Sequence, residues 1–319
     1  MNTLSNLEPF QNRRVRIPKK PPIVNLIKQH KLTNLLFYII NRCHLTPIDR
    51  ECRSHTKEKH VRPQPYIGVT GFIQANHDLA QFLLATIRGH FQVHHHLMVG
   101  ALASAKTLRG EQNKWPGRTP LIEDLASCFV NDPLAINLAH FATDDRDTID
   151  VQLMQLMDRA GPFCDGVQLN MVWPNIDQLA TAMLTKRMRR VVLQIGATAF
   201  RQVDENPQRL AERLDEYKDH VTDILFDLSG GHGLEMDSAR AIEVLRAVRT
   251  RHPNLGTGVA GGLSQETIHL LAPIVKEFPN INIDAEGRLR TPQPEDAMHD
   301  GKAMGYVTSA IDLFADSHL

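Results

Sequence analysis

One pattern in the second half of the chain constrains the fold: a short apolar run, then a glycine turn, then a helical stretch. Residues 223–233 read DILFDLSGGHG, and their apolar run is typical of a strand buried on both faces. The run ends at Asp227, and glycines follow at once. The same order recurs at 256–263 (GTGVAGGL) and 281–287 (INIDAEG). This repeat predicts parallel strands joined by helices, because parallel strands need a crossover connection.

Shorter versions of the pattern occur earlier and bring the expected number of strands to eight. Further strands are expected at 67–70, 96–103, 135–141, 165–170 and 190–195. Helices are expected between the strands, including 120–129 and 264–272, and at 301–315. Closing eight parallel strands into a ring removes the exposed edges, so we predict a (β/α)8 TIM barrel over residues 66–319. An open doubly wound sheet is the alternative, and it gives no reason for so regular an alternation.

Residues 1–65 differ in charge from the rest of the chain. They contain 13 Lys and Arg residues against 4 Asp and Glu, whereas 66–319 contain 23 against 32. We therefore expect a basic extension on an acidic barrel, with nucleic-acid contact, if any, through the extension alone. No apolar run approaches the length of about 20 residues that crosses a membrane. The four cysteines show no metal-ligand spacing, which favours a reducing, cytoplasmic setting.

The carboxyl ends of the predicted strands hold the candidate chemistry, because active sites of such barrels lie there. The strand-end residues are Thr70, Lys106, His140, Asn170, Gly196, Asp227, Gly261, Gly262 and Glu286. Asp227 is the expected general acid, because desolvation at a dry barrel mouth favours a protonated carboxyl group. The other interpretation of Asp227 is a cap of the following turn through backbone amides.

Two glycine pairs suggest an anion site. Gly230-Gly231 and Gly261-Gly262 allow backbone amides to approach an anion without obstruction by side chains. A helix beginning at Ser264 would add its dipole, so we predict a phosphate site after the sixth and seventh strands. Glycine pairs also simply make tight turns. His140 has no partner at metal-ligand spacing, and neither a metal nor another cofactor is expected.

Several of these segments resemble phosphoribosylanthranilate isomerase, a barrel enzyme of tryptophan biosynthesis. The likeness covers about residues 66–315 and is strongest at GVQLN (166–170), FDLSGGHG (226–233), VAGGLSQETI (259–268) and DAEGRL (284–289). The resemblance implies an Amadori rearrangement in which Asp227 is the acid. It also implies that Gly262 and Gly287 border the phosphate and that Lys106 meets a substrate carboxylate.

The chain departs from that family at three positions. Thr70 stands where the family has its catalytic cysteine base, and Asn170 stands in place of a histidine. Glu286 lies beside the implied phosphate, where Arg288 or Arg290 would have to offset its charge. The base is then expected to be His140, Asp144 or Glu286.

The sequence therefore predicts an isomerase that acts on a phosphorylated sugar or ribosyl compound, as a monomer or homodimer. The predicted catalytic residues are Asp227, Thr70, His140 and Glu286, and the predicted substrate-binding residues are Lys106, Asn170, Gly230, Gly231, Gly261, Gly262, Gly287 and Arg288. Two alternatives stay open. One is a lyase or ribosyl-transfer enzyme that uses Asp227 and Glu286 as a carboxylate pair. The other is a non-catalytic metabolite-binding protein whose basic extension carries an interaction.

Overall fold

The computed structural model describes residues 62–186, 188–227 and 236–317, and the predicted extension lies almost wholly outside this part. The strands are β1 (Tyr66–Thr70), β2 (His96–Ser104), β3 (Ala135–Ala142), β4 (Gly166–Asn170), β5 (Arg190–Gly196), β6 (Asp223–Asp227), β7 (Gly256–Ala260) and β8 (Asn282–Ala285). The helices are α3 (His77–Arg88), α4 (Ala105–Leu108), α5 (Ile149–Ala160), α6 (Ile176–Thr185), α7 (Ala197–Arg201), α8 (Pro207–Arg213), α9 (Ser238–Arg251), α10 (Ala272–Glu277) and α11 (Asp300–Asp316).

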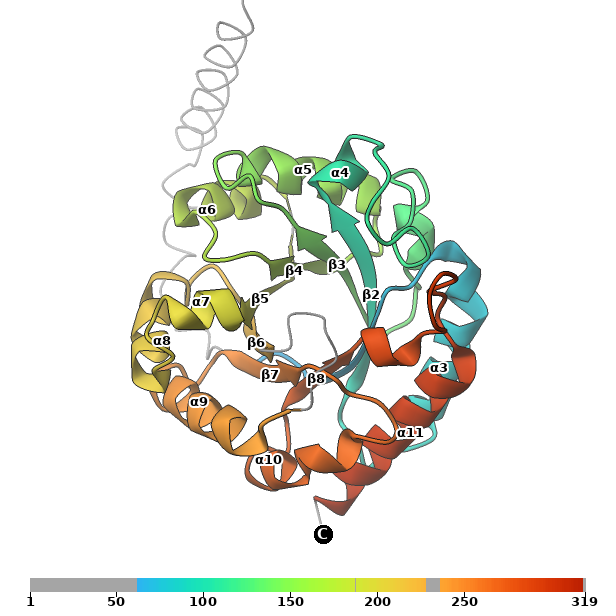
Figure 1. Ribbon diagram of the computed structural model, residues 1–319, viewed down its shortest axis with the longest axis vertical. Helices are drawn as coiled ribbons and strands as arrows, with labels where there is room; N and C mark the ends of the chain where they lie inside the picture. The colour runs from blue at the N-terminus through green and yellow to red at the C-terminus, as the bar shows by residue number, and fades with distance from the viewer. Residues whose placement is uncertain (1–61, 187, 228–235, 318–319) are drawn as a thin grey trace, which may run out of the picture. The chain divides into compact units, whose positions relative to one another are not determined.

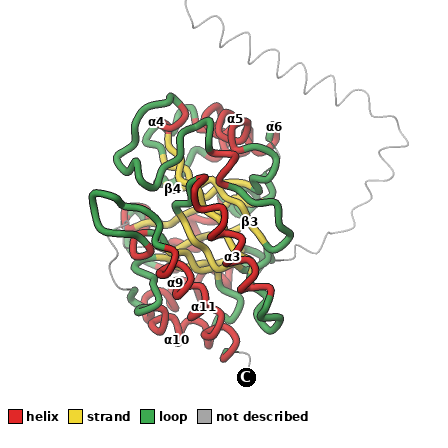
Figure 2. The backbone as a smooth tube through the Cα atoms, turned by 90° about the vertical axis from the view of Figure 1, so that its right-hand side faces the viewer, coloured by secondary structure: helices red, strands yellow, loops and turns green. Residues whose placement is uncertain are grey.

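The eight strands form one closed parallel barrel in chain order, which confirms the predicted fold. β8 returns to β1, with Ile283 opposite Ile67, so the ring has no open edge. The helices form an outer layer around the strands (Figure 1). In the side view, the strands lie between the helices (Figure 2).

Two helix predictions were wrong. Residues 120–129 contain only a 3-10 turn at Leu125–Cys128, and residues 264–272 form a turn followed by a 3-10 segment at Ile268–Leu271. In the second case the Thr267 hydroxyl donates to the Gly262 carbonyl at 2.7 Å and accepts from the Ser264 amide at 2.9 Å. These local bonds compete with helix formation, and α10 begins only at Ala272, next to a proline suited to a first helical turn.

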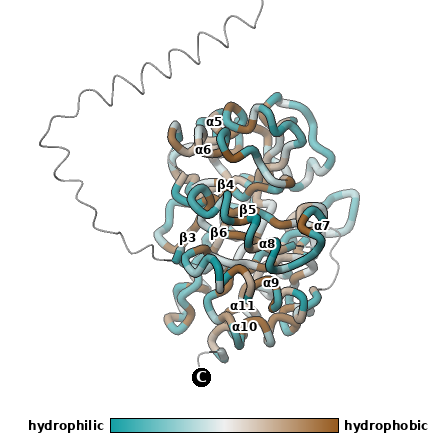
Figure 3. The backbone as a smooth tube through the Cα atoms, turned by 90° about the vertical axis from the view of Figure 1, so that its left-hand side faces the viewer, coloured by the Kyte–Doolittle hydropathy of each residue, from teal (hydrophilic) through white to brown (hydrophobic). Residues whose placement is uncertain are grey.

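Alternation along the strands divides the apolar residues into two cores. Outward side chains such as Val99, Phe141 and Val167 pack with the helices in one large cluster. That cluster draws on hydrophobic stretches of helices such as α5 and α10, shown brown in Figure 3. Inward side chains form a separate small cluster of Tyr66, Met98, Ile136, Leu138, Val192 and Leu225. The barrel interior is therefore filled by side chains at mid-height.

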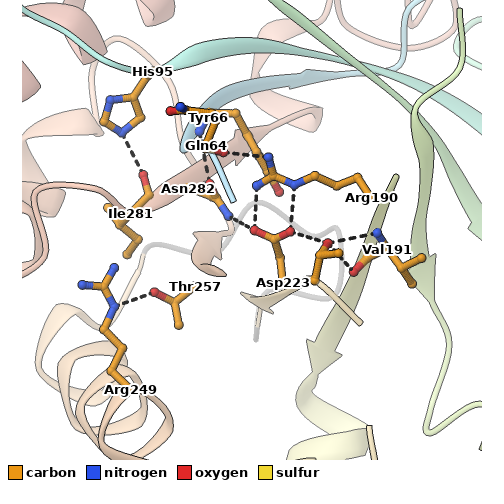
Figure 4. A network of polar contacts seen from close by, with 11 residues as sticks. Gln64, Tyr66, His95, Arg190, Val191, Asp223, Arg249, Thr257, Ile281 and Asn282 are labelled. Carbon is orange, nitrogen blue, oxygen red and sulfur yellow. Dashed lines mark hydrogen bonds and ion pairs between the residues drawn. The ribbon is translucent and has the colours of Figure 1, made fainter. Parts of the chain in front are cut away.

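A buried ion pair closes the floor of the barrel below that cluster (Figure 4). Arg190 donates from Nε and Nη2 to the two carboxylate oxygens of Asp223, at 2.7 and 2.6 Å. Asp223 also accepts from Asn282 Nδ2 at 2.8 Å, and Asn282 Oδ1 accepts from the Tyr66 amide at 3.1 Å. A Cβ at Gly256 would lie 1.8 Å from Asp223 Oδ1, so only glycine leaves room for this carboxylate. The network thus links β5 and β6 to β8 and β1.

We expect Arg190→Met to lower the free energy of unfolding by about 3–5 kcal/mol, because it leaves Asp223 buried and unpaired. The double variant Arg190→Met/Asp223→Leu is expected to recover most of this loss, since no charge then remains buried. Urea denaturation measures both effects. Arg246→Met, which breaks the exposed ion pair with Glu277, is the matched control and should cost less than about 1 kcal/mol. A similar small cost for Arg190→Met would contradict the role given to the floor.

Candidate active site

A cavity of about 810 Å³ opens at the carboxyl ends of the strands. Inward residues near the carboxyl ends of the strands form its base: His140 on β3, Gln168 on β4, Gln194 on β5, Asp227 on β6 and Asp284 on β8. All five are at least nine-tenths buried. A concave site with a few converging polar groups above an apolar layer is typical of a small-molecule site.

Asp284 is the most strongly perturbed carboxyl group of this cavity. Burial raises its pKa to about 7, and the nearby charges of Glu286 and Asp227 act in the same direction. Hydrogen bonds from Thr70 Oγ1 (2.8 Å) and Gln168 Nε2 (3.2 Å) oppose the shift but do not cancel it. Gly68 permits this arrangement, because a Cβ there would lie 2.9 Å from Asp284 Oδ1. Near neutral pH, Asp284 therefore exists in both protonated and ionised forms.

Two glutamines connect Asp284 to Asp227. Gln168 Nε2 lies 3.2 Å from Asp284 Oδ2 and 3.4 Å from Gln194 Oε1. Gln194 Nε2 in turn donates to Asp227 Oδ2 at 2.9 Å. The network holds two carboxyl groups in fixed orientations within one cavity, and two carboxyl groups in unlike environments can serve as acid and base.

His140 adds a neutral imidazole to the bottom of the same cavity. Burial lowers its pKa, while Glu286, Asp227 and Gln194 oppose that change. Its Nδ1 lies 3.5 Å from Gln168 Nε2. The imidazole is therefore held mainly in its uncharged form at neutral pH.

Arg118 connects two segments at the rim of the cavity. Its Nη1 donates to Glu286 Oε1 at 2.7 Å, and its Nε and Nη2 both donate to the carboxylate of Asp296. The guanidinium carbon also lies 5.0 Å from the centre of the Trp115 ring. Arg118 thus offsets the charge of Glu286, a role that the sequence had suggested for Arg288 or Arg290. Arg290 instead donates to the Gly71 and Asp296 carbonyl oxygens.

Part of the residue set predicted to bind an anion lines the cavity. Gly261 and Gly262 line the cavity with φ angles of +112° and +62°, a backbone conformation that favours glycine. Gly287 and Arg288 line the same wall. The helix expected to begin at Ser264 is absent, so the predicted contribution of its dipole was wrong. Gly230 and Gly231 lie outside the described residues.

Most of the other predicted site residues meet at this cavity. Asp227, His140, Asn170 and Glu286 all line it. Thr70 is fully buried, and its hydroxyl contacts Asp284 at the base of the cavity. Lys106 is exposed on α4 and does not line the cavity, where Lys114 of the following loop lies instead. The structure therefore does not bring Lys106 to the other predicted residues.

The sequence analysis missed Asp284, Gln168, Gln194 and Arg118. A signal existed for the first three, because each is a polar residue between two apolar residues of a predicted strand. Asn282, Asp284 and Glu286 alternate with Ile283 and Ala285, as expected of a barrel strand whose polar side chains face inward. Arg118 had no comparable signal, because its partners Glu286 and Asp296 are distant in sequence.

Within the described ranges, no group of three or more His, Cys, Asp and Glu side chains is placed to hold a metal ion. None of the helices in the described residues has the length and apolarity required for a membrane span.

The closed ring and its polar mouth define a (β/α)8 barrel, a fold that commonly supports enzymes. No protein-family model and no curated protein sequence matches the chain. Among solved structures, it is similar to the carboxyl transferase domain of Rhizobium etli pyruvate carboxylase with pyruvate, at 8% identity and a TM-score of 0.46 over 79% of this chain and 47% of that chain. It is also similar to active domain 2 of the chitinase from Pyrococcus furiosus, at 11% identity and a TM-score of 0.45 over 80% of this chain and 96% of that chain.

These likenesses concern the barrel fold alone. The chain spans about half the length of the carboxyl transferase domain that it matches.

We expect Asp284→Asn to stabilise the protein relative to wild type as the pH rises. The unfolded carboxyl group ionises near its ordinary pKa of 3.8, whereas the folded one keeps its proton up to about 7. Between these values the folded state binds more protons, so this group lowers stability with rising pH, by at most about 4 kcal/mol in total. The measurement is the difference in free energy of unfolding between the variant and wild type from about pH 4 to 8.

Asp312→Asn, at an exposed position on α11, is the control for the general effect of removing one carboxylate. A difference between Asp284→Asn and wild type that stays constant with pH would contradict the raised pKa.

Proposed function

We propose that this barrel is an isomerase that carries out an Amadori-type aldose–ketose rearrangement on a phosphorylated sugar or ribosyl compound. The observation that carries the proposal is the buried Asp284, with its pKa of about 7, joined through Gln168 and Gln194 to Asp227. Such a rearrangement needs one acid and one base and no net oxidant, because one carbon is oxidised as its neighbour is reduced. The site offers both groups within one cavity.

Asp284 is assigned as the acid and Asp227 as the base. The acid gives its proton to the ring oxygen of the sugar, and the bond between that oxygen and the first carbon breaks as a lone pair of the hydroxyl or amine on the first carbon forms a C=O or C=N double bond. For an aldose, the hydroxyl proton released in this step returns to Asp284. The base then takes the proton from the second carbon, and the electron pair of that C–H bond forms the enol or enamine double bond. Return of a proton to the first carbon, with loss of the hydroxyl proton on the second carbon as its C=O forms, completes the ketose. This assignment replaces the sequence-based choice of Asp227 as the acid, because burial favours the protonated form of Asp284.

Thr70 has a supporting role in this scheme. Its hydroxyl contacts both Asp284 oxygens, at 2.8 and 3.1 Å, so it orients the acid. A threonine hydroxyl is too weak an acid to take the place of a thiolate base at neutral pH.

The phosphate of the substrate is assigned to the wall formed by Gly261, Gly262, Gly287 and Arg288. Their place on the cavity wall supports this assignment, because glycine amides and a guanidinium are suited to phosphate oxygens. The alternative in which Asp227 and Glu286 form the acid–base pair is less favoured, since Glu286 is engaged by Arg118 at the rim.

We expect the wild-type protein in deuterium oxide to incorporate deuterium next to the carbonyl carbon of its sugar substrate, because the base exchanges the removed proton with solvent. Proton NMR of a panel of phosphorylated aldoses and ribosylamines, phosphoribosylanthranilate included, measures this exchange. Turnover is expected to fall tenfold per pH unit above about 7 as Asp284 loses its proton.

Asp284→Asn and Asp227→Asn are each expected to lower turnover by about 100-fold or more while substrate binding persists. Asp312→Asn is the control. Unchanged turnover in both site variants, or no exchange with any compound of the panel, would contradict the proposed function.

We expect Arg288→Gln to weaken binding of a phosphorylated substrate about tenfold or more, because a charge-assisted hydrogen bond is lost. Binding of the same sugar without phosphate should not change. Isothermal calorimetry with both compounds measures the two affinities, and Arg201→Gln, on α7, is the control arginine. Equal weakening for both compounds would contradict the phosphate assignment.

A further inference from the structure

Within the part of the chain that the structure describes, two buried polar atoms at the base of the cavity have no hydrogen-bond partner: His140 Nε2 and Gln168 Oε1. Their side chains are 7% and 1% exposed, and both residues line the cavity. An unpaired buried polar atom costs about 1–3 kcal/mol, and native structures contain few of them. Two such atoms on one cavity wall indicate that a ligand supplies their partners.

The orientation of the Gln168 amide follows from its neighbours. Its Nε2 lies within hydrogen-bond distance of two oxygens, Asp284 Oδ2 at 3.2 Å and Gln194 Oε1 at 3.4 Å. Exchanging the amide nitrogen and oxygen would place Gln168 Oε1 against Gln194 Oε1, which cannot donate a hydrogen bond. Gln168 Oε1 is therefore the free end of the amide, and it acts only as an acceptor.

The tautomer of His140 follows from the same amide. Gln168 Nε2 is a donor without acceptor capacity and lies 3.5 Å from His140 Nδ1, so we assign the acceptor role to that ring nitrogen. The proton of the neutral ring is then on Nε2. Burial lowers the pKa of His140, which agrees with a neutral ring. His140 Nε2–H is therefore a donor awaiting an acceptor.

We propose that His140 Nε2–H and Gln168 Oε1 form a donor–acceptor subsite that binds an open-chain α-hydroxycarbonyl group. The carbonyl oxygen accepts from His140, and the neighbouring hydroxyl donates to Gln168. This inference rests on the proposed function, because an aldose or ketose presents such a group once its ring has opened. The open-chain form presents a planar carbonyl acceptor beside the hydroxyl donor, whereas the closed ring has a hydroxyl in place of the carbonyl.

The subsite also gives His140 a part in the reaction. A neutral imidazole that donates to the carbonyl oxygen polarises it without giving up its proton. As Asp227 takes the proton from the carbon beside the carbonyl, the electron pair of that C–H bond forms the carbon–carbon double bond. The carbonyl π electrons move to the oxygen, which takes its proton from Asp284. One proton leaves carbon and one reaches oxygen, so the enediol carries the charge of the starting sugar.

The test uses two stable probes with four carbons each. Phosphoerythronohydroxamate has a carbonyl beside an N–OH donor, whereas erythritol phosphate has hydroxyl groups only. We expect wild type to bind the hydroxamate at least about tenfold more tightly, as one additional matched hydrogen bond implies. His140→Phe and Gln168→Met should each remove this preference and leave the affinity for erythritol phosphate unchanged. His90→Gln, a change at an exposed histidine beyond α3, is the control.

Nitrogen NMR of isotope-labelled histidine reads the tautomer in the folded wild type, with the His140 signal assigned by its absence in His140→Gln. A neutral ring protonated at Nε2 is expected at neutral pH. A ring protonated at Nδ1, or a charged ring, would overturn the subsite even if His140→Phe failed to fold.

The outcomes separate this inference from the proposed function. Deuterium exchange by a wild type that binds both probes equally overturns the subsite and leaves the isomerase standing. A hydroxamate preference that depends on His140, in a protein that exchanges no proton of any sugar, supports the subsite and overturns the isomerase. Equal binding of both probes without any exchange overturns both.

Discussion

Closure of the β-ring is the constraint on which the rest of the structure depends. Once β8 pairs with β1, every second strand residue points into one shared interior, and that interior has no other exit than its two ends. Apolar side chains such as Leu138 and Leu225 fill the middle. Polar side chains can then lie only at the floor and at the mouth, where hydrogen-bond partners or solvent are within reach.

Burial has opposite consequences for the carboxyl groups at the two polar ends of the barrel. At the floor, Asp223 is fully paired with Arg190, Asn282 and Thr222, so its charge is compensated on every side. At the mouth, the side chains that donate to Asp284 within the described part of the chain are the neutral Thr70 and Gln168. The same residue type therefore serves as a structural anion at one end and as a proton-exchanging group at the other, because the available partners differ.

Arg118 shows how the mouth is assembled from distant segments. It joins the loop after β2 to Glu286 and Asp296 after β8, across more than 160 positions of the sequence. This contact pairs the rim residue Glu286 with a cation, whereas the side chains that donate to Asp284 among the described residues are neutral. The division between rim and base is what gives the cavity two kinds of carboxyl group, and such differences are the usual basis of acid–base pairs.

The sequence by itself determined the eight strands, their parallel order and the end of the barrel where chemistry is expected, because alternation and glycine turns are local signals. It also placed Asp227, His140 and Glu286 at that end. The sequence-based prediction was wrong for the segment after β7, where the Thr267 hydroxyl forms local hydrogen bonds with backbone groups of Ser264 and Gly262. The helix therefore begins later than predicted. Only the tertiary structure decided which carboxyl group keeps its proton, since the pKa of Asp284 depends on burial and on Gln168, Thr70 and Glu286, which closure of the ring brings together. Desolvation is a property of the assembled interior, and no stretch of sequence carries it alone.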